Sequence, residues 1–416
     1  MTTPAPAPAR APLMALEEAL QRLLAQALPL DRRMDVSTFD ADGRVLAQDL
    51  VSQLQVPPQD NSSMDGYALR CADVPQAGAV LQVTQRIPAG SSGKPLEPLS
   101  AARIFTGAPI PAGADAVVMQ EDCEVVNECE GGVRVNAVPQ PGQWIRRAGE
   151  DVMRGACVLQ KGARLTPAAL GLAASIGMDR LSVQAPVRVA LFSTGDELVM
   201  PGSIAPQDMK PGAIYNSNRF FLRSLLLRVG CVVSDLGIVP DQREATIAAL
   251  REAAAGHDLI LTSGGVSVGE EDHVKPAVQS LGSLDLWQIG MKPGKPFAYG
   301  KVGASHFIGL PGNPVSSFVT FVLLVRPFIL RLCAQTVVAP KSIAMPAHFT
   351  LAKGDKRREF LRVRRNAAGG LDLFPNQSSG VLTSVTWGDG LVDNPPGRSI
   401  AHGDLVQFLP FAELLA

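Results

Sequence analysis

DLILTSGGVSVGEEDH, residues 258–273, is the stretch that most constrains the fold. It begins with an apolar run at residues 259–261, becomes polar and glycine-rich at residues 263–265, and ends in acids at residues 270–272. This order is typical of a buried parallel strand that leads through a loop into a helix. The glycines allow a ligand close to the backbone and can direct N–H groups at an anion. The carboxylates can bind a hard cation or transfer a proton.

Residues 187–334 repeat this pattern of strand, loop and helix. The runs VRVALF (187–192) and CVVSDLGIV (231–239) predict strands, and short strands are expected around LWQI, FAY and HFIGL. Helices are predicted at 216–229, 242–255, 275–281 and from 314 to 333. This alternation predicts an open, mostly parallel α/β sheet with helices on both faces.

Polar clusters directly follow four of the predicted strands. Ligands bind outside the carboxyl ends of the strands in such a sheet, so we expect the clusters to converge on one edge. Single members also have a structural explanation, because Asp241 and Asp272 fit helix N-caps and Asp241 with Glu244 fits a capping box. Asn313 followed by Pro314 fits a cap with proline at the first helical position. The clusters comprise Thr194, Gly195, Asp196, Glu197, Asp241, Ser263, Gly264, Gly265, Ser267, Asp272, Pro311, Gly312, Asn313 and Pro314.

The segment KPGKP, residues 292–296, presents two lysines on a stiff turn. Lys292 and Lys295 suit a phosphate or another oxyanion, and the alternative is a basic surface turn. A Walker A motif is excluded, because Pro296 stands where that motif has Ser or Thr.

The remaining segments predict further domains around this sheet. Residues 1–11 are a Pro/Ala-rich tail, and residues 12–57 with 150–186 form a helical linker domain in two segments. Residues 58–149 form an inserted β domain, 187–335 the α/β domain, and 336–416 a C-terminal β domain. In the C-terminal domain, strand alternation puts Arg362 and Arg364 on one charged face. That face is either solvated or part of a cleft for an anionic ligand.

Two segments of the inserted domain carry candidate polar groups. PPQDNSSMDGYALR, residues 57–70, is a loop by composition, with either an ordinary turn or a functional role for its carboxylates. IRRAGEDV, residues 145–152, places Arg146 and Arg147 beside Glu150 and Asp151. The second cluster is either solvated or an anion clamp next to a metal-binding acid.

Composition excludes several classes of protein. The chain has 416 residues, a net charge of -1 and a pI of about 6.5, which argue against nucleic-acid or anionic-membrane binding. Six cysteines without C-x-x-C and five isolated histidines indicate free thiols in a reducing compartment and no zinc site. The apolar run at 318–330 contains Arg326-Pro327 and predicts a core helix, so we expect a cytoplasmic protein without a membrane span.

Seven motifs together resemble one family, the molybdopterin molybdenumtransferases, which include bacterial MoeA and the related gephyrin E domain. They occur in one order over most of the chain: DNSSMDGYA at 60, TGAPIPAGADAVV at 106, IRRAGED at 145, FSTGDEL at 192, SGGVSVGEEDH at 263, KPGKPF at 292 and GLPGNPVS at 309. The resemblance implies a helical linker domain, an inserted β domain, a MogA-like α/β domain and a C-terminal β-barrel. It also implies an elongated homodimer whose active cleft lies between the subunits.

The resemblance implies an enzyme that takes adenylylated molybdopterin and molybdate and releases AMP and molybdenum cofactor, assisted by Mg²⁺. Its partners would be a MogA-like adenylyltransferase and enzymes that accept the cofactor. Backbone donors of the 263–265 loop would bind phosphates, and Arg146, Arg147 or a lysine would hold molybdate. The implied metal ligands are Asp196, Glu197, Asp241 and Asp272.

The resemblance assigns further roles by position. Lys292 and Lys295 would stabilise charge when the phosphoanhydride breaks, and Asp241 and Asp272 remain candidates for both metal binding and proton transfer. From the partner subunit, Asp65, Thr106 and Asp151 would reach the same cleft. The C-terminal segments REFLRV and QSSG add Arg358 and Ser379 as ligand-binding residues.

Three other functions can be weighed against this one. The run GVSVG, 265–269, fits the G-x-S-x-G elbow of serine hydrolases, with Ser267 as nucleophile and Asp285 and His306 in triad order. No HGGG-type segment accompanies it, and it leaves the other motifs unexplained. A peptide-binding scaffold would not need the acidic cluster. A DNA-binding role has only the basic stretch at 353–365, which the net charge of -1 offsets.

Overall fold

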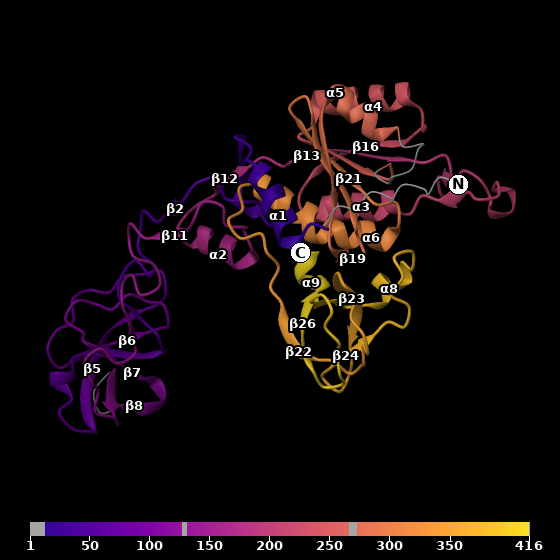
Figure 1. The fold of residues 1–416 in the computed structure, drawn as a ribbon. Helices are drawn as coiled ribbons and strands as arrows, with labels where there is room; N and C mark the ends of the chain where they lie inside the picture. The colour runs from indigo at the N-terminus through magenta and orange to yellow at the C-terminus, as the bar shows by residue number, and fades with distance from the viewer. Residues whose placement is uncertain (1–12, 127–130, 266–272, 416) are drawn as a thin grey trace, which may run out of the picture.

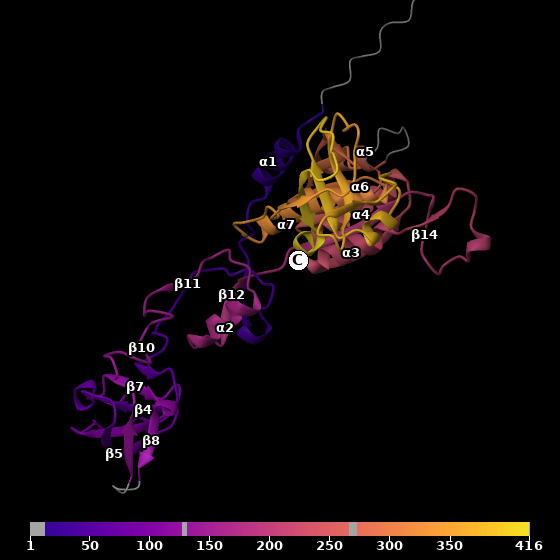
Figure 2. The ribbon, with the colours of Figure 1, turned by 90° about the horizontal axis from the view of Figure 1, so that it is seen from below.

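The chain folds into an elongated molecule in which an arm separates one small β sheet from a larger α/β body (Figures 1 and 2). The computed structural model describes residues 13–126, 131–265 and 273–415. Ser267 and Asp272, both singled out above, lie outside the described residues. The C-terminal β sheet packs beside the α/β body, so the arm carries only the inserted sheet (Figure 1).

The central sheet of the α/β body is mixed and mostly parallel. Its six strands are ordered β16-β13-β17-β21-β20-β18, and the first four are parallel while β20 and β18 are antiparallel to their neighbours. Ser193 pairs with Ser263, and Ser263 pairs with Leu310, so neighbouring strands end at the same edge. The strands are β13 (Arg188–Thr194), β16 (Val232–Val239), β17 (Leu259–Ser263), β18 (Gly282–Gln288), β20 (Pro296–Val302) and β21 (Ser305–Leu310).

Helices cover both faces of this sheet, as its apolar strands require. On β13, Val189 and Leu191 face one core while Ala190 and Phe192 face the other. The first core includes α3 (Asn218–Arg228), α6 (Pro314–Thr320) and α7 (Arg326–Leu332), and the second includes α4 (Arg243–Gly256) and α5 (Val274–Leu281). Figure 1 shows α4 and α5 on the side of the sheet opposite α3 and α6.

The apolar run at residues 318–330, predicted to be a core helix, is helical and buried in the structure. A π-helical segment, η5 (Phe321–Val325), joins α6 to α7 just before Pro327. Proline has no N–H for an intrahelical bond, and a wider turn accommodates that loss. The helical stretch of residues 314–332 is long and apolar enough to cross a membrane, but 94% of its apolar part is buried inside the protein. The helix is therefore a core element.

The inserted sheet is joined to the body by two chain segments that run side by side. β1 (Arg33–Ser37) pairs with β12 (Arg180–Gln184), β2 (Leu50–Val51) with β11 (Cys157–Leu159), and β3 (Asn61–Ser62) with β10 (Ile145–Arg146), all antiparallel. The inserted sheet has the order β7-β4-β6-β5-β9-β8. Its strands are β4 (Gly66–Leu69), β5 (Ala79–Ile87), β6 (Ser100–Ile104), β7 (Ala116–Met119), β8 (Cys123–Val126) and β9 (Gly132–Val135).

The two linker helices belong to different cores. α2 (Pro167–Ser175) packs with the linker strands through Ala169 and Ala173. α1 (Leu16–Gln26) instead buries Leu16, Ala19 and Leu23 in the first core of the α/β body. The division into domains at the boundaries given above stays an interpretation.

The C-terminal sheet closes on itself. Its order is β19-β23-β25-β26-β22, β24 also pairs with β23, and a bridge between Ala347 and Leu371 joins the end of β22 to β24. β19 (Met291–Lys292) belongs to the KPGKP segment, so that segment is hydrogen-bonded to the C-terminal sheet. The other elements are β22 (Ile343–Pro346), β23 (Arg358–Arg365), β24 (Leu371–Leu373), β25 (Gly390–Asn394), β26 (Leu405–Pro410), α8 (Thr383–Trp387) and α9 (Phe411–Leu414).

The prediction of one charged face on β23 is wrong for Arg362. Arg364 is exposed, whereas Arg362 is 1% exposed. The side of β23 that bears Arg362 is covered by residues 377–384, which accept hydrogen bonds from it. Alternation along a strand gives the side of the sheet but does not show which later segment covers it.

Candidate active site at the strand ends

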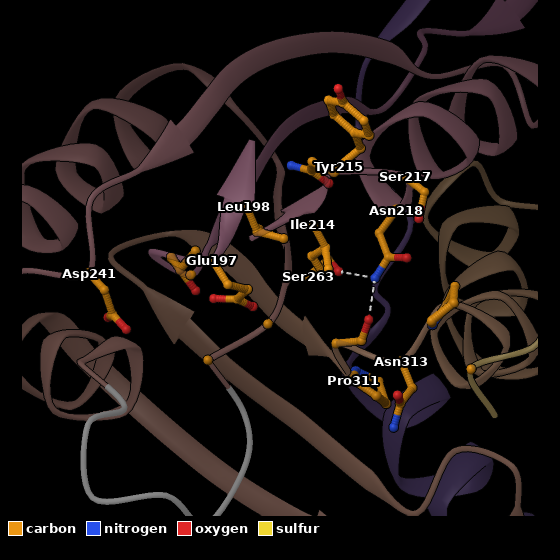
Figure 3. Close-up of a pocket in the computed structure, with 18 of the residues that line it drawn as sticks. Glu197, Leu198, Ile214, Tyr215, Ser217, Asn218, Asp241, Ser263, Pro311 and Asn313 are labelled. Carbon is orange, nitrogen blue, oxygen red and sulfur yellow. Dashed lines mark hydrogen bonds between the residues drawn. The ribbon is translucent and has the colours of Figure 1, made fainter. Parts of the chain in front are cut away.

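A cavity of about 770 Å³ lies at the carboxyl ends of the parallel strands (Figure 3). The loops after β13, β16, β17 and β21 all contribute to it, as the sheet register requires. The first turns of α3 and α6 also line it. Its walls include Thr194, Gly195, Glu197, Leu198, Ile214, Tyr215, Asn216, Ser217, Asn218, Asp241, Ser263, Gly264, Gly265, Pro296, Pro311, Gly312, Asn313, Pro314 and Gly380.

Close backbone packing shapes the floor of this cavity. Gly264 has a φ of +95°, and a Cβ on it would lie 2.7 Å from the Thr194 carbonyl oxygen. Only glycine fits both the left-handed backbone and this approach. The loop after β17 is therefore held against the end of β13, which brings Ser263 and Thr194 to the same wall.

Asn218 joins two of the strand-end loops from the start of α3. Its side-chain amide donates to Ser263 Oγ and to the Gly312 carbonyl oxygen, each at 2.7 Å (Figure 3). The side chain is 7% exposed, and its bond to Ser263 is buried. Asn218 is not among the site residues predicted above, where residues 216–229 were predicted only to form a helix. The cluster Asn216-Ser217-Asn218 at the predicted helix start, directly before an apolar periodic run, was the available signal.

Two carboxylates face the cavity at one side, Glu197 and Asp241 (Figure 3). Asp196 lies next to them, and its Oδ1 accepts a hydrogen bond of 3.4 Å from the Asp241 backbone N–H. Within the described ranges, no group of three or more His, Cys, Asp or Glu side chains is close enough to hold a metal ion. The described acids thus supply hard oxygen donors in a pair, and Asp272 lies outside the described residues.

The structural explanation as a helix cap fails for Asp241, but for Asn313 the predicted N-cap with proline at the start of the helix is found. The N-cap of α4 is Gln242 and has no side-chain cap, so Asp241 does not close a capping box with Glu244. Asn313 does occupy the N-cap of α6, but its side chain makes no capping hydrogen bond. Both polar side chains therefore remain available to a ligand in the cavity.

The two lysines of KPGKP face a second cavity, of about 680 Å³, beside the C-terminal sheet. Pro296 of the same turn lines the strand-end cavity, so the turn lies between the two cavities. Lys292 Nζ is 3.2 Å from both Asp355 and Glu359. Burial lowers the pKa of Lys292, but its hydrogen bonds to Glu359 and Asp355 outweigh this and raise it. The second cavity is lined by Leu13, Lys292, Lys295, Leu351, Lys353, Gly354, Asp355, Lys356, Arg357, Glu359, Leu361 and Gln377.

The candidate residues of the inserted domain line neither cavity and belong to the part of the chain that the arm holds away from the α/β body (Figures 1 and 2). The backbone N–H and the hydroxyl of Thr106 each donate to Asp65 Oδ1 at 2.8 Å, and these bonds lower the pKa of Asp65. Arg147 donates to Asp60 at 2.6 Å. Arg146 and Asp151 are exposed, and none of these residues lines either cavity of the same chain.

Three family models match the chain. They are described as MoeA N-terminal region (domain I and II) at residues 14–177, Probable molybdopterin binding domain at 190–331, and MoeA C-terminal region (domain IV) at 344–411. The molybdopterin molybdenumtransferase of Haemophilus influenzae is 42% identical over 340 residues, 81% of each chain. The chain belongs to the MoeA family. Molybdopterin molybdenumtransferase 2 of Mycobacterium tuberculosis is 37% identical over 90% of this chain and 94% of its own.

A solved MoeA structure agrees with this fold over nearly the whole chain. The molybdopterin biosynthesis MoeA protein of Pyrococcus horikoshii has a TM-score of 0.84 and 26% identity, covering 96% of this chain and 100% of that one. The fold predicted from the resemblance, an α/β sheet domain with β-rich N- and C-terminal parts, is therefore confirmed.

Two C-terminal residues predicted to bind ligand occupy different places in this MoeA-family chain. Arg358 donates to both oxygens of Asp393, at 2.6 and 2.5 Å, and also to Glu17 of α1. Its guanidinium therefore joins the C-terminal sheet to the helix at the start of the chain. The Ser379 carbonyl oxygen accepts a 2.9 Å hydrogen bond from the Val315 N–H in the first turn of α6, next to the strand-end cavity.

The geometry argues against a serine hydrolase in a MoeA-family chain. His306 pairs with Leu259 at the start of β17, four residues before Ser263, so it lies about 13 Å along the strand from the polar edge. It stacks edge-on with Phe328 and bonds Tyr299, and burial lowers its pKa to about 4. Asp285 lines a separate cavity beside α1. Neither residue lies at the polar edge of the sheet, where the described start of the loop after β17 lies.

Proposed function

We propose that this chain inserts molybdenum from molybdate into molybdopterin, taking the adenylylated form of molybdopterin and releasing AMP. As a family member, the chain is a molybdopterin molybdenumtransferase of molybdenum cofactor biosynthesis. The observation that carries the detailed proposal is the pair of cavities separated by the KPGKP turn, one lined mainly by neutral polar groups and one by basic groups.

The strand-end cavity suits the large, phosphate-bearing substrate. Its loops and the first turns of α3 and α6 offer backbone N–H groups, and helix N-termini favour negative charge. A volume of about 770 Å³ is within the range of sites for cofactor-sized ligands. In this proposal Thr194, Ser263, Gly264, Gly265 and Asn313 contact the pterin and adenylate parts of the substrate.

Glu197 and Asp241, with Asp196 beside them, have the oxygen donors that Mg²⁺ prefers, and Asp272, outside the described residues, is kept as a further ligand from the resemblance. A bound Mg²⁺ would neutralise charge on the phosphoanhydride. The strand-end cavity has no lysine or arginine among its described lining residues. The carboxylates alone would repel the phosphates, which is the physical reason for a cation there.

The basic cavity suits the second substrate, the molybdate dianion. Lysines 292, 295, 353 and 356 and Arg357 line it, and only Asp355 and Glu359 oppose them. Lys292 is occupied by both acids, whereas Lys295 forms no ion pair within the described part of the chain. We therefore assign Lys295 the direct contact to molybdate, and we assign Lys292 the placement of the turn.

The arm explains why a second copy of the chain would be required. Asp65 and Thr106 lie in the inserted domain, which the arm holds away from the α/β body, and Asp151 is exposed next to the Val56–Val152 pair where the inserted domain begins. They can act at a strand-end cavity only if that cavity belongs to another subunit, so we propose a homodimer with a shared cleft. An adenylyltransferase of the MogA type would supply the substrate in the cytoplasm, and enzymes that use the cofactor would receive the product.

The test is AMP release from adenylylated molybdopterin, measured with and without molybdate and with and without Mg²⁺. We expect wild-type protein to release AMP in a molybdate-dependent manner. Asp241→Asn should slow release about 100- to 1,000-fold, as is typical when an electrostatic group at the reacting charge is removed. The matched control is Asp208→Asn, which makes the same change at an exposed turn.

Two results would contradict the proposal. Tight binding of the adenylylated substrate without AMP release by wild type would indicate a binding protein and not a transferase. Equal activity of Asp241→Asn and Asp208→Asn would remove Asp241 from the chemistry.

A further inference from the structure

Arg362 is a buried cation that has no role in the function proposed above. It is the largest fully buried side chain in the described chain, with 1% of its surface exposed. It forms no ion pair with any carboxylate in the ranges 13–126, 131–265 and 273–415. Burying an unpaired charge costs free energy, because water is lost and no opposite charge replaces it.

The partners of the Arg362 guanidinium are all neutral oxygens. Nε donates to Ser384 Oγ at 3.2 Å, Nη1 to the Phe360 carbonyl at 3.0 Å, and Nη2 to the Ser378 carbonyl at 3.4 Å. These bonds reduce the cost of burial without cancelling the charge. The positive charge is therefore held at a fixed place behind the loop of residues 377–380.

The backbone of Arg362 is hydrogen-bonded to the same loop. Its N–H donates to Gln377 Oε1 at 2.9 Å, and its carbonyl accepts from Gln377 Nε2 at 3.0 Å. The loop in turn accepts the Val315 N–H at the Ser379 carbonyl. A continuous series of contacts thus runs from Arg362 through the loop to the first turn of α6, which lines the strand-end cavity.

The loop of residues 377–380 forms part of the wall between the two cavities. Gln377 lines the basic cavity and Gly380 lines the strand-end cavity. On the KPGKP turn the same division holds, with Lys295 on the basic side and Pro296 on the other. Two segments that are far apart in the sequence therefore share the wall. The buried charge beside the KPGKP turn, Glu359, is paired with Lys292, whereas Arg362 behind the 377–380 loop has no ion pair in the described chain.

We infer that Arg362 is a positioning residue that fixes the 377–380 loop as the wall between the two cavities and biases that wall toward an anion. The inference rests on the proposed function, because it takes the two cavities to hold the two substrates. The guanidinium holds the loop through the Ser378 carbonyl and holds the segment that follows it through Ser384 Oγ, and the alignment of the substrates depends on this loop. The unpaired charge acts through the loop and strengthens the binding of the molybdate dianion.

The experiment compares three variants by molybdate-dependent AMP release, with separate kcat and apparent KM for molybdate. Arg362→Met removes the charge and keeps the length, Arg362→Lys keeps the charge and loses the fork, and Arg365→Met makes the same change at an exposed position of the same strand. We expect Arg362→Met to raise the apparent KM at least tenfold. Arg362→Lys should keep the KM within about threefold of wild type but lower kcat, and Arg365→Met should change neither more than about twofold.

Several outcomes would overturn the inference. One is a wild-type KM in Arg362→Met, and another is the same rise in KM for the methionine and lysine variants, which would indicate packing alone. If Arg362→Met does not fold, as judged by its melting curve, wild-type kcat and KM in Arg362→Lys would refute the positioning role. If wild type releases no AMP, the proposed function fails separately. Equilibrium dialysis of molybdate against wild type and Arg362→Lys or Arg362→Met then tests the charge effect, and equal affinities of wild type and Arg362→Met would refute it.

Discussion

The cavity at the strand ends and the cavity beside the C-terminal sheet share a wall, yet they present charge in different ways. The first is lined by backbone groups, amides and hydroxyls, with Glu197 and Asp241 as its only described charges. The second is lined by five basic and two acidic side chains. Neutral donors suit an extended ligand that must be bound along its length, whereas clustered ammonium groups suit a compact dianion.

The difference also teaches how each cavity is held together. Asn218 ties two loops of the first cavity through neutral hydrogen bonds, which salt does not screen. Lys292, Asp355 and Glu359 tie the second cavity through ion pairs, which respond to pH and salt. Variants that affect one cavity and spare the other test whether the two act as separate sites.

The largest expected effect is on the turn between the cavities. Gly294 has a φ of +109°, and a Cβ on it would lie 2.5 Å from Thr320 Oγ1 of α6. Gly294→Ala should therefore lower the free energy of unfolding by about 3 kcal/mol and weaken the binding of both substrates. Urea denaturation measures the first effect and steady-state kinetics the second.

Gly303→Ala is the matched control for this prediction. Gly303 also has a positive φ, of +58°, but no atom lies within 4 Å of the position of its Cβ. Gly303→Ala should lower the free energy of unfolding by only about 1 kcal/mol, the cost of a left-handed backbone for a residue with a Cβ. Equal losses in the two variants would show that contact with α6 does not constrain the turn.

A smaller effect is expected at the neutral cavity. Asn218→Ala removes one buried and one partly buried hydrogen bond and should lower the free energy of unfolding by about 2 kcal/mol. It should raise the KM for adenylylated molybdopterin and leave the KM for molybdate unchanged. Asn136→Ala, at an exposed site of the inserted domain, is the control. A rise in the molybdate KM alone would contradict the assignment of the two substrates.

At the basic cavity, Lys295→Met should raise the apparent KM for molybdate roughly tenfold, the effect of losing one charge-assisted contact. The KM for adenylylated molybdopterin should not change. Lys301→Met, on the strand that follows the turn but facing another cavity, controls for loss of a lysine. If the KM of both substrates rises together in Lys295→Met, the two cavities work as one site.

The smallest expected effect is on the stability of the protein at acidic pH. Arg357, and then Lys292, bond Asp355 and hold the pKa of that carboxyl well below its usual range. A lowered folded-state pKa stabilises the fold above the unfolded value of about 4, and the contribution is lost as the pH falls below it. Wild type should lose at most about 1 kcal/mol more than Asp355→Asn between about pH 6 and about pH 3. Urea denaturation at both pH values, with Asp208→Asn as reference, measures this difference, and identical losses would contradict it.

Much of the neutral cavity could be predicted from the sequence, and little of the basic one. Strand alternation places the residues that follow each strand at one edge, so Thr194, Ser263 and Asn313 follow from local patterns alone. Asn218 was within reach of the same reasoning, because it starts a predicted helix. The role of each residue in the reaction remains a prediction.

The basic cavity depends on contacts between distant segments. Lys292 forms ion pairs with Asp355 and Glu359, and Arg362 is buried beneath a loop that starts at Gln377. No periodicity links these positions, since each is set by how the C-terminal sheet docks on the α/β body. The inserted domain shows the same limit, because the position of Asp65 relative to the cavity depends on the length and direction of the arm.

The way the arm is joined to the rest of the chain has a practical consequence. The chain leaves at Val56 and returns at Val152, which are antiparallel neighbours: Val56 N–H donates to the Val152 carbonyl at 2.7 Å, and Val152 N–H to the Val56 carbonyl at 3.1 Å. A tight hairpin turn can span such a pair. We therefore expect that residues 57–151 can be replaced by a hairpin turn, which would leave the residues that line both cavities in one continuous polypeptide.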